Sequence, residues 1–409
     1  MAALPQQPGI LNFEEARHVV ERHAAQEHAR GTENVDLLAA CGRVLAEALV
    51  ADRDFPPFRR AMRDGYAVRS ADLAQLPATL DVIGEVRAGA ADVPAEVLSG
   101  HAVAIMTGAP SPAGADAVVM VEYTALGGNR VTITRGVSSG DNIVPVGSEA
   151  QMGQVLLEPG TSLGYCEIAA AASVGKSTIQ VFRRPTVAIL STGDEVVDVS
   201  QKPGPSQIRN SNSYSLAVQV MQAGGEPHLL GIARDDQSSL RGLIAQGLES
   251  NLLLLTGGVS AGKYDLVEQV LSEFGAEFYF TGAQIQPGKP IVFGRARDKY
   301  FFGLPGNPVS TMVTFELFAK PMLQAIAGVR LAPLIFLHGR LKAEIKTKTG
   351  LQRFLPGRLS GEFEQCQVEL ARWHGSGDVA ATARANCYIV IPPDREQIAA
   401  GEWVAVMMR

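Results

Sequence analysis

The sequence predicts a multidomain α/β protein: a central doubly wound α/β domain, a β-rich inserted domain, a helical segment and a small C-terminal β-barrel. Three observations lead to this fold class. The chain has 409 residues, more than the roughly 250–300 residues that one hydrophobic core usually serves. Apolar strands alternate with helical segments between residues 185 and 331, the pattern of a parallel sheet covered by helices. Short period-two runs, separated by glycine and proline, lie on both sides of this region.

The first part of the chain predicts helices. Apolar side chains recur at helical spacing at Phe13, Ala16 and Val20. Further apolar stretches at residues 35–50 and 162–173 are also predicted to be helical. We therefore expect residues 1–50 and 147–184 to form one helical linker domain.

Residues 51–146 predict a β-rich domain inserted into that linker domain. Its β-like runs are separated by glycine and proline turns and lie at residues 80–86, 102–106, 117–122 and 130–133.

Residues 185–331 carry the clearest pattern. Strands are predicted at residues 187–190, 228–232, 252–255 and 300–304, and helices at residues 213–223, 238–248, 266–274 and 309–327. This alternation predicts a parallel doubly wound sheet. Beyond Pro333 the period-two runs at residues 336–345, 387–391 and 403–407 predict a small β-barrel or sandwich over residues 332–409.

Composition excludes several classes of protein. The chain is 46% hydrophobic and 19% charged, its mean hydropathy is +0.09, its formal charge is −6 and its pI is about 5.7. An acidic chain without a basic stripe argues against nucleic-acid binding. Its apolar runs are shorter than the roughly 18 residues of a membrane span, and the first residues lack a secretory signal pattern. We expect a cytoplasmic protein with no nucleic-acid or membrane partner.

The cysteines and histidines do not predict a transition-metal site. Cys41, Cys166, Cys366 and Cys387 are far apart in the sequence and form no CxxC pair, and the seven histidines form no HExxH motif. We expect reduced and mostly buried thiols.

Three glycine-containing loops follow predicted strands of the central sheet. They are residues 191–195 (STGDE), 256–260 (TGGVS) and 303–308 (GLPGNP). In open α/β sheets ligands bind at this edge, and glycines allow backbone N–H groups to approach an anion closely. One such loop alone would more often be a tight turn, but three at one sheet edge favour a phosphate site.

Acidic residues accompany these loops. Glu195, Asp235 and Asp265 follow three of the strands. Carboxylates repel a phosphate unless a cation lies between them, and oxygen ligands beside phosphate are typical of Mg²⁺. The acids therefore imply Mg²⁺ ligands, with helix N-capping as the alternative role for Asp235 and Asp265.

Three other residues have weaker local signals. Lys289 lies in a stiff Pro-Gly-Lys-Pro turn and could contact an anion, although a loop lysine is more often a solvated charge. Asp64 and Thr107 lie in turn-like stretches of the inserted domain, where a turn residue and a cap are the plain interpretations.

Six motifs together resemble the MoeA family of molybdopterin molybdenumtransferases, which includes the E domain of gephyrin. They are the three loops above with residues 63–69 (RDGYAVR), 106–109 (MTGA) and 287–290 (PGKP), in the family's order and spacing. The resemblance covers nearly the whole chain. The TGGVS loop also occurs in molybdopterin adenylyltransferases and CinA-type proteins.

This resemblance implies a homodimer of four-domain subunits in which residues 185–331 form a molybdopterin-binding domain. The implied reaction is Mg²⁺-dependent: molybdenum from molybdate enters adenylylated molybdopterin and AMP is released. A molybdopterin adenylyltransferase would be the upstream partner. Because the chain lacks a thiolate cluster, the sulfur ligands of molybdenum must come from the dithiolene of the substrate.

The resemblance also implies roles for residues that match the family's motifs. Glu195, Asp235 and Asp265 match acids that organise Mg²⁺, and Asp64 and Thr107 match site residues of the inserted domain. Lys289 and Ser260 match oxyanion positions. The implied catalytic residues are Asp64, Thr107, Glu195, Asp235, Asp265 and Lys289; the implied substrate-binding residues are Gly257, Gly258, Ser260, Pro305, Asn307, Pro308 and Ser376.

The chain departs from the family's pattern at basic positions, which carry Val144, Val146, Gln286 and Pro356 here. Arg353 or Arg358 could replace the arginine lost at Pro356. Two alternatives to the transferase therefore stay open: an enzyme that inserts tungsten or acts on a related pterin nucleotide, and a non-catalytic scaffold of the gephyrin E type.

Overall fold

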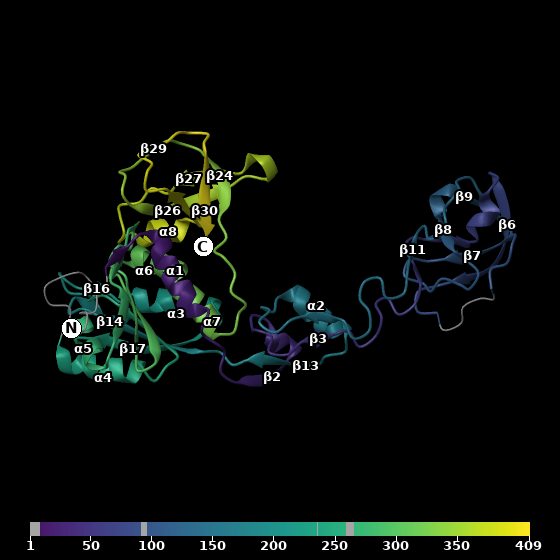
Figure 1. Cartoon of the computed structure of the whole chain (residues 1–409). Helices are drawn as coiled ribbons and strands as arrows, with labels where there is room; N and C mark the ends of the chain where they lie inside the picture. The colour runs from purple at the N-terminus through teal and green to yellow at the C-terminus, as the bar shows by residue number, and fades with distance from the viewer. Residues whose placement is uncertain (1–8, 91–95, 235, 259–265) are drawn as a thin grey trace, which may run out of the picture. The chain divides into compact units, whose positions relative to one another are not determined.

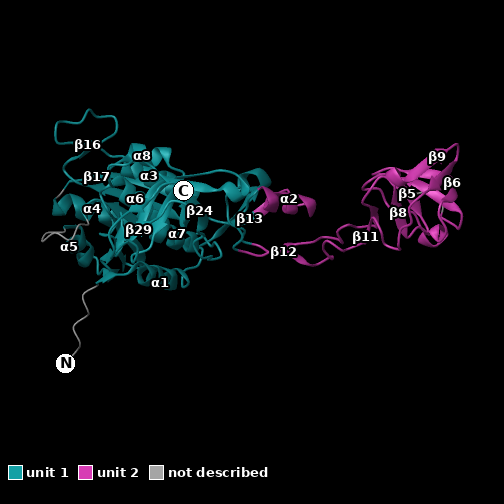
Figure 2. Cartoon of the chain, turned by 90° about the horizontal axis from the view of Figure 1, so that it is seen from above, with its two compact units in different colours: residues 1–46, 160–164, 180–409 teal, residues 47–159, 165–179 magenta. Residues whose placement is uncertain are grey.

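The computed structural model describes residues 9–90, 96–234, 236–258 and 266–409. The chain forms two compact units, coloured separately in Figure 2. Unit 1 comprises residues 1–46, 160–164 and 180–409, and unit 2 comprises residues 47–159 and 165–179. Within the described residues, every helix is too short or too polar to cross a bilayer. The four-domain boundaries expected from the sequence stay a prediction.

Unit 1 is built on a six-stranded sheet with the strand order β17-β14-β18-β23-β22-β19. Figure 1 labels β14 and β17 of this sheet. Its strands are β14 (Thr186–Thr192), β17 (Glu226–Ala233), β18 (Leu252–Thr256), β19 (Glu277–Phe280), β22 (Val292–Ala296) and β23 (Lys299–Leu304). β18 is buried at every position. A strand covered on both faces has no polar side, which explains its continuous run of leucines.

Helices cover both faces of this sheet, as the sequence predicted. One face of β14, Val187 and Ile189, belongs to a core cluster with α1 (Phe13–Ala24), α3 (Asn212–Gln222), α6 (Pro308–Thr314) and α7 (Lys320–Ile326). The other face, Ala188 and Leu190, packs in a cluster with α4 (Gln237–Gly247) and α5 (Leu266–Glu273). Successive side chains of one strand point to opposite faces of the sheet, so β14 contributes to two cores.

The sheet is mixed rather than fully parallel. β17, β14, β18 and β23 are parallel, but β22 pairs antiparallel with both β23 and β19. β22 and β23 are joined by Arg297 and Asp298, which have φ values of 47° and 63°. Two consecutive residues with positive φ are typical of a tight hairpin turn, and a hairpin forces the antiparallel direction.

The helix predicted at residues 309–327 is continuous but changes its winding. It runs through α6, a π-helical segment at Phe315–Ala319 and α7. Pro321 lies just after the π segment. Because proline lacks an N–H and its ring clashes with the preceding turn, wider winding before it relieves the clash.

The predicted C-terminal barrel is confirmed. Its strands are β24 (Leu337–Leu341), β26 (Gln352–Ser360), β27 (Gln367–Leu370), β28 (Cys387–Ile391) and β30 (Trp403–Met408). The β26–β28 pairing closes the ring. Two segments from the central region and the barrel also pair: β21 (Ile285–Gln286) lies parallel to the start of β26. Further short elements are β20 (Gly282–Ala283), β25 (Ile345–Lys346), β29 (Gln397–Ile398) and α8 (Val379–Arg384).

The N-terminal part of the chain is only partly helical. α1 begins at a capping box in which Asn12 and Glu15 bond each other's backbone N–H. The second predicted helix, at residues 35–50, is wrong: this stretch holds parts of β2 (Thr32–Asp36) and β3 (Leu49–Val50) and a 3₁₀ turn at Leu37–Ala40. Its apolar residues do not share one buried face, since Leu38 is 89% exposed, and Gly42 has a positive φ that ends any helix there.

Unit 2 contains a six-stranded sheet with the order β8-β5-β7-β6-β10-β9. The strands are β5 (Gly65–Val68), β6 (Ala78–Val86), β7 (His101–Ile105), β8 (Ala117–Met120), β9 (Thr124–Gly127) and β10 (Arg130–Ile133). The predicted strands of this region are confirmed. Among the described residues, the other α-helix and strands are α2 (Tyr165–Ser173), β1 (Ile10–Leu11), β4 (Arg60–Ala61), β11 (Ile143–Val144), β12 (Val155–Leu157), β13 (Thr178–Phe182), β15 (Val196–Val197) and β16 (Ile208–Arg209).

Candidate functional site

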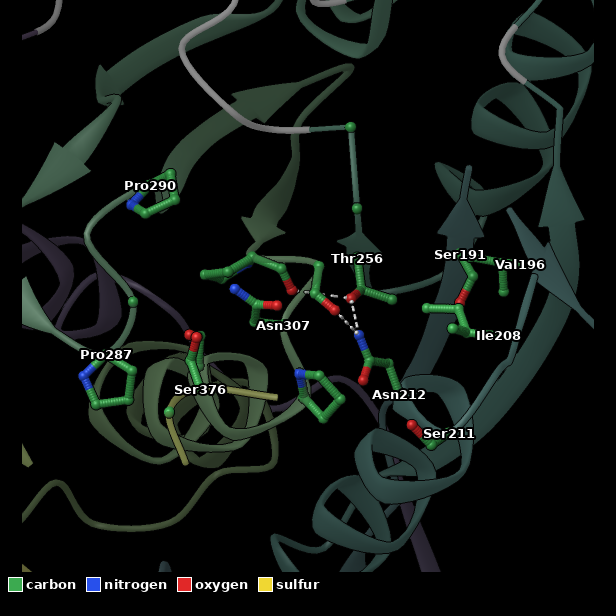
Figure 3. Close-up of a pocket in the computed structure, with 18 of the residues that line it drawn as sticks. Ser191, Val196, Ile208, Ser211, Asn212, Thr256, Pro287, Pro290, Asn307 and Ser376 are labelled. Carbon is green, nitrogen blue, oxygen red and sulfur yellow. Dashed lines mark hydrogen bonds between the residues drawn. The ribbon is translucent and has the colours of Figure 1, made fainter. Parts of the chain in front are cut away.

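A cavity of about 1000 Å³ opens at the carboxyl ends of β14, β18 and β23 in unit 1 (Figure 3). This is the edge where open α/β sheets bind ligands. The barrel contributes Leu351, Trp373 and Ser376 to the wall of the cavity. The described residues that line the cavity include Thr192, Glu195, Ile208, Arg209, Asn210, Asn212, Thr256, Gly257, Gly258, Ile285, Gln286, Pro287, Lys289, Pro290, Pro305, Asn307, Pro308, Leu351, Trp373 and Ser376.

The Gly257–Gly258 loop is packed directly on the end of β14. Both residues have positive φ, 89° and 63°. A Cβ at Gly257 would lie 2.5 Å from the carbonyl oxygen of Thr192, and one at Gly258 would lie 2.7 Å from the hydroxyl of Thr192. Glycine is therefore required by conformation and by space, and both residues line the cavity with no side chain of their own.

Asn212 connects three elements around the cavity. Its Nδ2 donates to Thr256 Oγ1 at 2.9 Å and to the carbonyl oxygen of Gly306 at 2.8 Å. The Thr256 hydroxyl in turn donates to the carbonyl oxygen of Pro305 at 3.1 Å. Figure 3 draws this network. It fixes the first residue of α3, the end of β18 and the loop after β23 against one another, so the floor of the cavity is held rigidly.

A second buried network lies beneath β16. Ser191 Oγ is 2.8 Å from Ser213 Oγ and donates to Asn210 Oδ1 at 3.1 Å, while Asn210 Nδ2 donates to Ser213 Oγ at 3.0 Å. These three side chains are nearly fully buried. Because each bonds another, the segment after β16 is anchored to β14 and α3.

The charged side chains of the lining are few and exposed. Among its described residues, Glu195 is the acid and Arg209 and Lys289 are the bases. Arg209 is positioned by a 3.1 Å hydrogen bond from its Nε to the carbonyl oxygen of Gln201. Two cations and one carboxylate suit an anionic ligand better than a cationic one.

The metal-ligand set expected from the sequence is only partly described. Glu195 lines the cavity, but Asp235 and Asp265 lie outside the described residues. Within the part of the chain that the structure describes, no three His, Cys, Asp or Glu side chains gather as a metal site. The described lining offers hydroxyl, carbonyl and carboxylate oxygens and no thiolate or imidazole. This donor chemistry fits a hard cation such as Mg²⁺.

The loop before α8 forms part of the barrel wall. The carbonyl oxygen of Ser376 accepts a 3.0 Å hydrogen bond from the N–H of Val309 at the start of α6. Asp378 caps α8 by accepting from the N–H of Ala381 at 2.9 Å. The barrel wall is thus tied to the helix that follows β23.

Asp64 and Thr107 form a pair in unit 2. One carboxylate oxygen of Asp64 accepts from the N–H of Thr107 at 2.6 Å and from its hydroxyl at 2.8 Å. These two bonds, the backbone one foremost, hold the pKa of Asp64 below its usual range. The neighbouring Gly65 is needed because a Cβ there would lie 1.8 Å from the carbonyl oxygen of Val119 on β8. Asp64, interpreted as a turn residue, and Thr107, interpreted as a cap, therefore bond each other. This contact presents an ionised carboxylate on the surface.

The sequence-predicted site residues fall into three groups. The residues brought together at the cavity are Glu195, Gly257, Gly258, Lys289, Pro305, Asn307, Pro308 and Ser376. Asp64 and Thr107 contact each other in unit 2. Asp235, Ser260 and Asp265 lie outside the described residues. The N-cap of α4 is Asp236, whose carboxylate accepts from the N–H of Ser239 at 2.8 Å.

Sequence reasoning missed several lining residues. Asn212 begins a helix that leaves the same sheet edge, so its position at a helix start was an available signal. Arg209 and Trp373 had no such signal, because their places depend on the β15–β16 pairing and on the contact between the barrel and α6.

Arg353 is 7% exposed, its guanidinium donates to the carbonyl oxygen of Leu351 at 3.1 Å, and burial lowers its pKa. Two of the four cysteines, Cys41 and Cys166, are exposed, so the expectation of mostly buried thiols is wrong.

Comparisons with known proteins agree along the chain. Three family models match: the MoeA N-terminal region (domain I and II) over residues 11–175, a probable molybdopterin binding domain over residues 188–325, and the MoeA C-terminal region (domain IV) over residues 338–408. A molybdopterin molybdenumtransferase of Nostoc sp. is 36% identical over 92% of this chain and 88% of its own length. One of Bacillus subtilis is 33% identical, with 92% and 90% covered.

A solved structure is similar over nearly the whole chain. The crystal structure of the molybdopterin biosynthesis moeA protein from Pyrococcus horikoshii OT3 superposes with a TM-score of 0.79 at 30% identity, covering 98% of this chain and 100% of that one.

Proposed function

The chain belongs to the MoeA family of transferases in molybdenum cofactor biosynthesis, and we propose that it inserts molybdenum from molybdate into adenylylated molybdopterin with release of AMP. The observation that carries this proposal is the chemistry of the cavity. Its described lining combines a bare glycine loop, two exposed cations and oxygen donors, without a sulfur ligand. Such a site suits a phosphate-bearing substrate that brings its own dithiolene sulfurs for the molybdenum.

In this proposal the residues of the chain position two anions. The backbone at Gly257 and Gly258 can approach the phosphate end of the substrate closely, because glycine carries no side chain. Lys289 and Arg209 offset the negative charge of phosphate and molybdate. The Asn212 network keeps these loops in place, so the binding free energy is not used to order them.

Mg²⁺ is part of the proposal because the oxygen donors fit it. Glu195 would hold the ion, together with Asp235 and Asp265 from outside the described residues. When bound, Mg²⁺ would screen the repulsion between the anions and stabilise charge on the departing AMP.

We further propose a homodimer that acts in the cytoplasm and receives its substrate from a molybdopterin adenylyltransferase. The exposed Asp64 carboxylate would then meet the central cavity of the partner subunit. Mixing Asp64→Asn subunits with Glu195→Gln subunits tests this arrangement. If residues of two subunits share one site, the mixture regains part of the activity that both variants lack alone; a mixture that stays inactive contradicts the shared site.

The direct test measures AMP release from adenylylated molybdopterin with Mg²⁺, with and without molybdate, and counts molybdenum in the recovered cofactor. We expect AMP and inserted molybdenum in equal amounts, and loss of both on chelation. Glu195→Gln should lower the rate by about a hundredfold, because one charged ligand is lost.

The matched control is Asp198→Asn. Asp198 is an exposed acid three residues beyond Glu195 that bonds Ser200 and does not line the cavity. An equal loss in both variants, or AMP release that is insensitive to chelation, would refute the role of Glu195.

A further inference from the structure

We propose that Trp373 is an aromatic platform on which a planar nitrogen heterocycle of the substrate stacks, an inference that rests on the proposed function. The substrate would carry two such rings, a purine and a pterin. Trp373 comes from the barrel, whereas the glycine loops come from the central sheet. The platform would therefore add a second binding element to the same cavity, from a different part of the chain.

The position of Trp373 supports this role. Trp373 is the aromatic residue among the described residues that line the cavity. It is half-buried: it packs against the barrel core cluster that contains Leu355 and Ile389, and it also lines the cavity. A tryptophan used purely as core would leave no surface in a ligand pocket.

The loop that carries Trp373 is held on both sides. Before it, the N–H of Ala371 donates to the carbonyl oxygen of Pro356 at 2.9 Å. After it, the N–H of His374 donates to the Asp378 carboxylate at 3.1 Å, and the Ser376 carbonyl oxygen accepts from Val309. An aromatic ring on a pinned loop loses little conformational entropy on binding, which is the condition for a useful stacking surface.

The surrounding surface also suits a flat ring. Pro287, Pro290, Pro305 and Pro308 contribute rigid apolar faces to the same cavity, beside Leu351 from the barrel. Stacking on an aromatic face is largely independent of the exact ring, because every base presents a π-face. The geometry therefore points to recognition of a heterocycle, and calorimetric titrations can separate purine from pterin.

The chain offers a clean spectroscopic test because it has two tryptophans. The other, Trp403, lies on β30, is 52% exposed and faces the Arg340 guanidinium at 5.1 Å. In a Trp403→Phe background the tryptophan fluorescence comes from Trp373 alone. Titration with AMP or with 6-hydroxymethylpterin, whichever carries the ring that stacks, should change this fluorescence, and titration with ribose 5-phosphate, which lacks a ring, should not.

Calorimetric binding then separates the two rings. AMP and 6-hydroxymethylpterin are titrated into the wild-type chain and into Trp373→Ala, Trp373→Phe and Trp403→Ala. We expect Trp373→Ala to weaken one of the two ring ligands about tenfold, Trp373→Phe to weaken it less, and Trp403→Ala to leave it unchanged. Ribose 5-phosphate should bind all four proteins equally. Thermal unfolding checks that each variant is folded.

Three outcomes would overturn the platform: unchanged affinity for both rings in Trp373→Ala, an equal loss for ribose 5-phosphate, or no binding of either ring to the wild-type chain at millimolar concentration. These outcomes are distinct from failure of the proposed function. A wild-type chain that binds a ring on Trp373 but releases no AMP would refute the transferase and keep the platform. Normal AMP release, together with unaltered ring affinity in Trp373→Ala, would support the transferase and refute the platform.

Discussion

The cavity of unit 1 and the Asp64–Thr107 pair of unit 2 differ in how their polar groups are held. In the cavity, buried side chains such as Asn212 and Ser191 bond several neighbours, and the glycine loop fits its surroundings without spare space. In unit 2, one exposed carboxylate is fixed by two bonds from a single residue. The first arrangement positions a ligand through shape and the second through charge, so the two should respond differently to substitution.

The largest expected effect comes from breaking the shape of the cavity. In Gly257→Ala the added Cβ would lie 2.5 Å from the Thr192 carbonyl oxygen, so the loop must shift. A displacement of about 1 Å in a binding loop can lower kcat/KM by about a hundredfold, and we expect a loss of this size in AMP release.

Gly42→Ala is the matched control, because Gly42 has a similar φ of 73° and nothing within 4 Å of the added Cβ. Both variants should lose about 1–2 kcal/mol of unfolding free energy from the left-handed conformation. Only Gly257→Ala should also lose activity. Wild-type rates in Gly257→Ala would show that the cavity is not held as tightly as the networks indicate.

The next effect comes from removing the charge in unit 2. Asp64→Asn keeps the volume of the side chain but loses the ionised carboxylate, and we expect AMP release to fall about ten- to hundredfold. Asp72→Asn is the control within the same unit, because Asp72 likewise accepts from a hydroxyl, of Ser99, and from a backbone N–H, of Gly100. Equal rates in the two variants would make Asp64 a turn residue only.

The same contrast explains what could be predicted from the sequence. The strands β14, β18 and β23 were predictable because a strand buried on both faces is a continuous apolar run. The sequence did not predict β19 and β22. The glycines of the STGDE and TGGVS loops were predictable because positive φ at Gly193, Gly257 and Gly258 favours glycine. Both signals are local.

The elements that were not predictable depend on contacts distant in the sequence. Residues 35–50 are apolar enough for a helix, but β2 pairs with β13 and β3 with β12, and such pairings outweigh helix propensity. Trp373 lies at the cavity because the barrel loop bonds the start of α6. The Asp64–Thr107 bond joins residues 43 positions apart, so the local sequence left Asp64 as a turn residue and Thr107 as a cap.

The smallest expected effect concerns the pH dependence of Asp64. Two bonds from Thr107 favour the ionised carboxylate and lower its pKa below 3.8. Thr107→Val removes the hydroxyl bond and keeps the backbone bond, so the pKa should rise part of the way back. Because the ionised form exists above the pKa and is lost as pH falls through it, the acid limb of kcat/KM should move to higher pH.

The loss at neutral pH should be limited to about threefold, since Asp64 stays ionised there in both proteins. Thr107→Ser retains the donor and should keep the wild-type profile. Comparing the two variants separates two roles of the Thr107 side chain, stabilising the charge of Asp64 and filling space. A pH profile that shifts in Thr107→Val and not in Thr107→Ser assigns the hydroxyl to charge stabilisation, as expected if unit 2 acts through charge. A large loss at neutral pH without a shift would mean that Thr107 acts through its shape, as the residues of the cavity do.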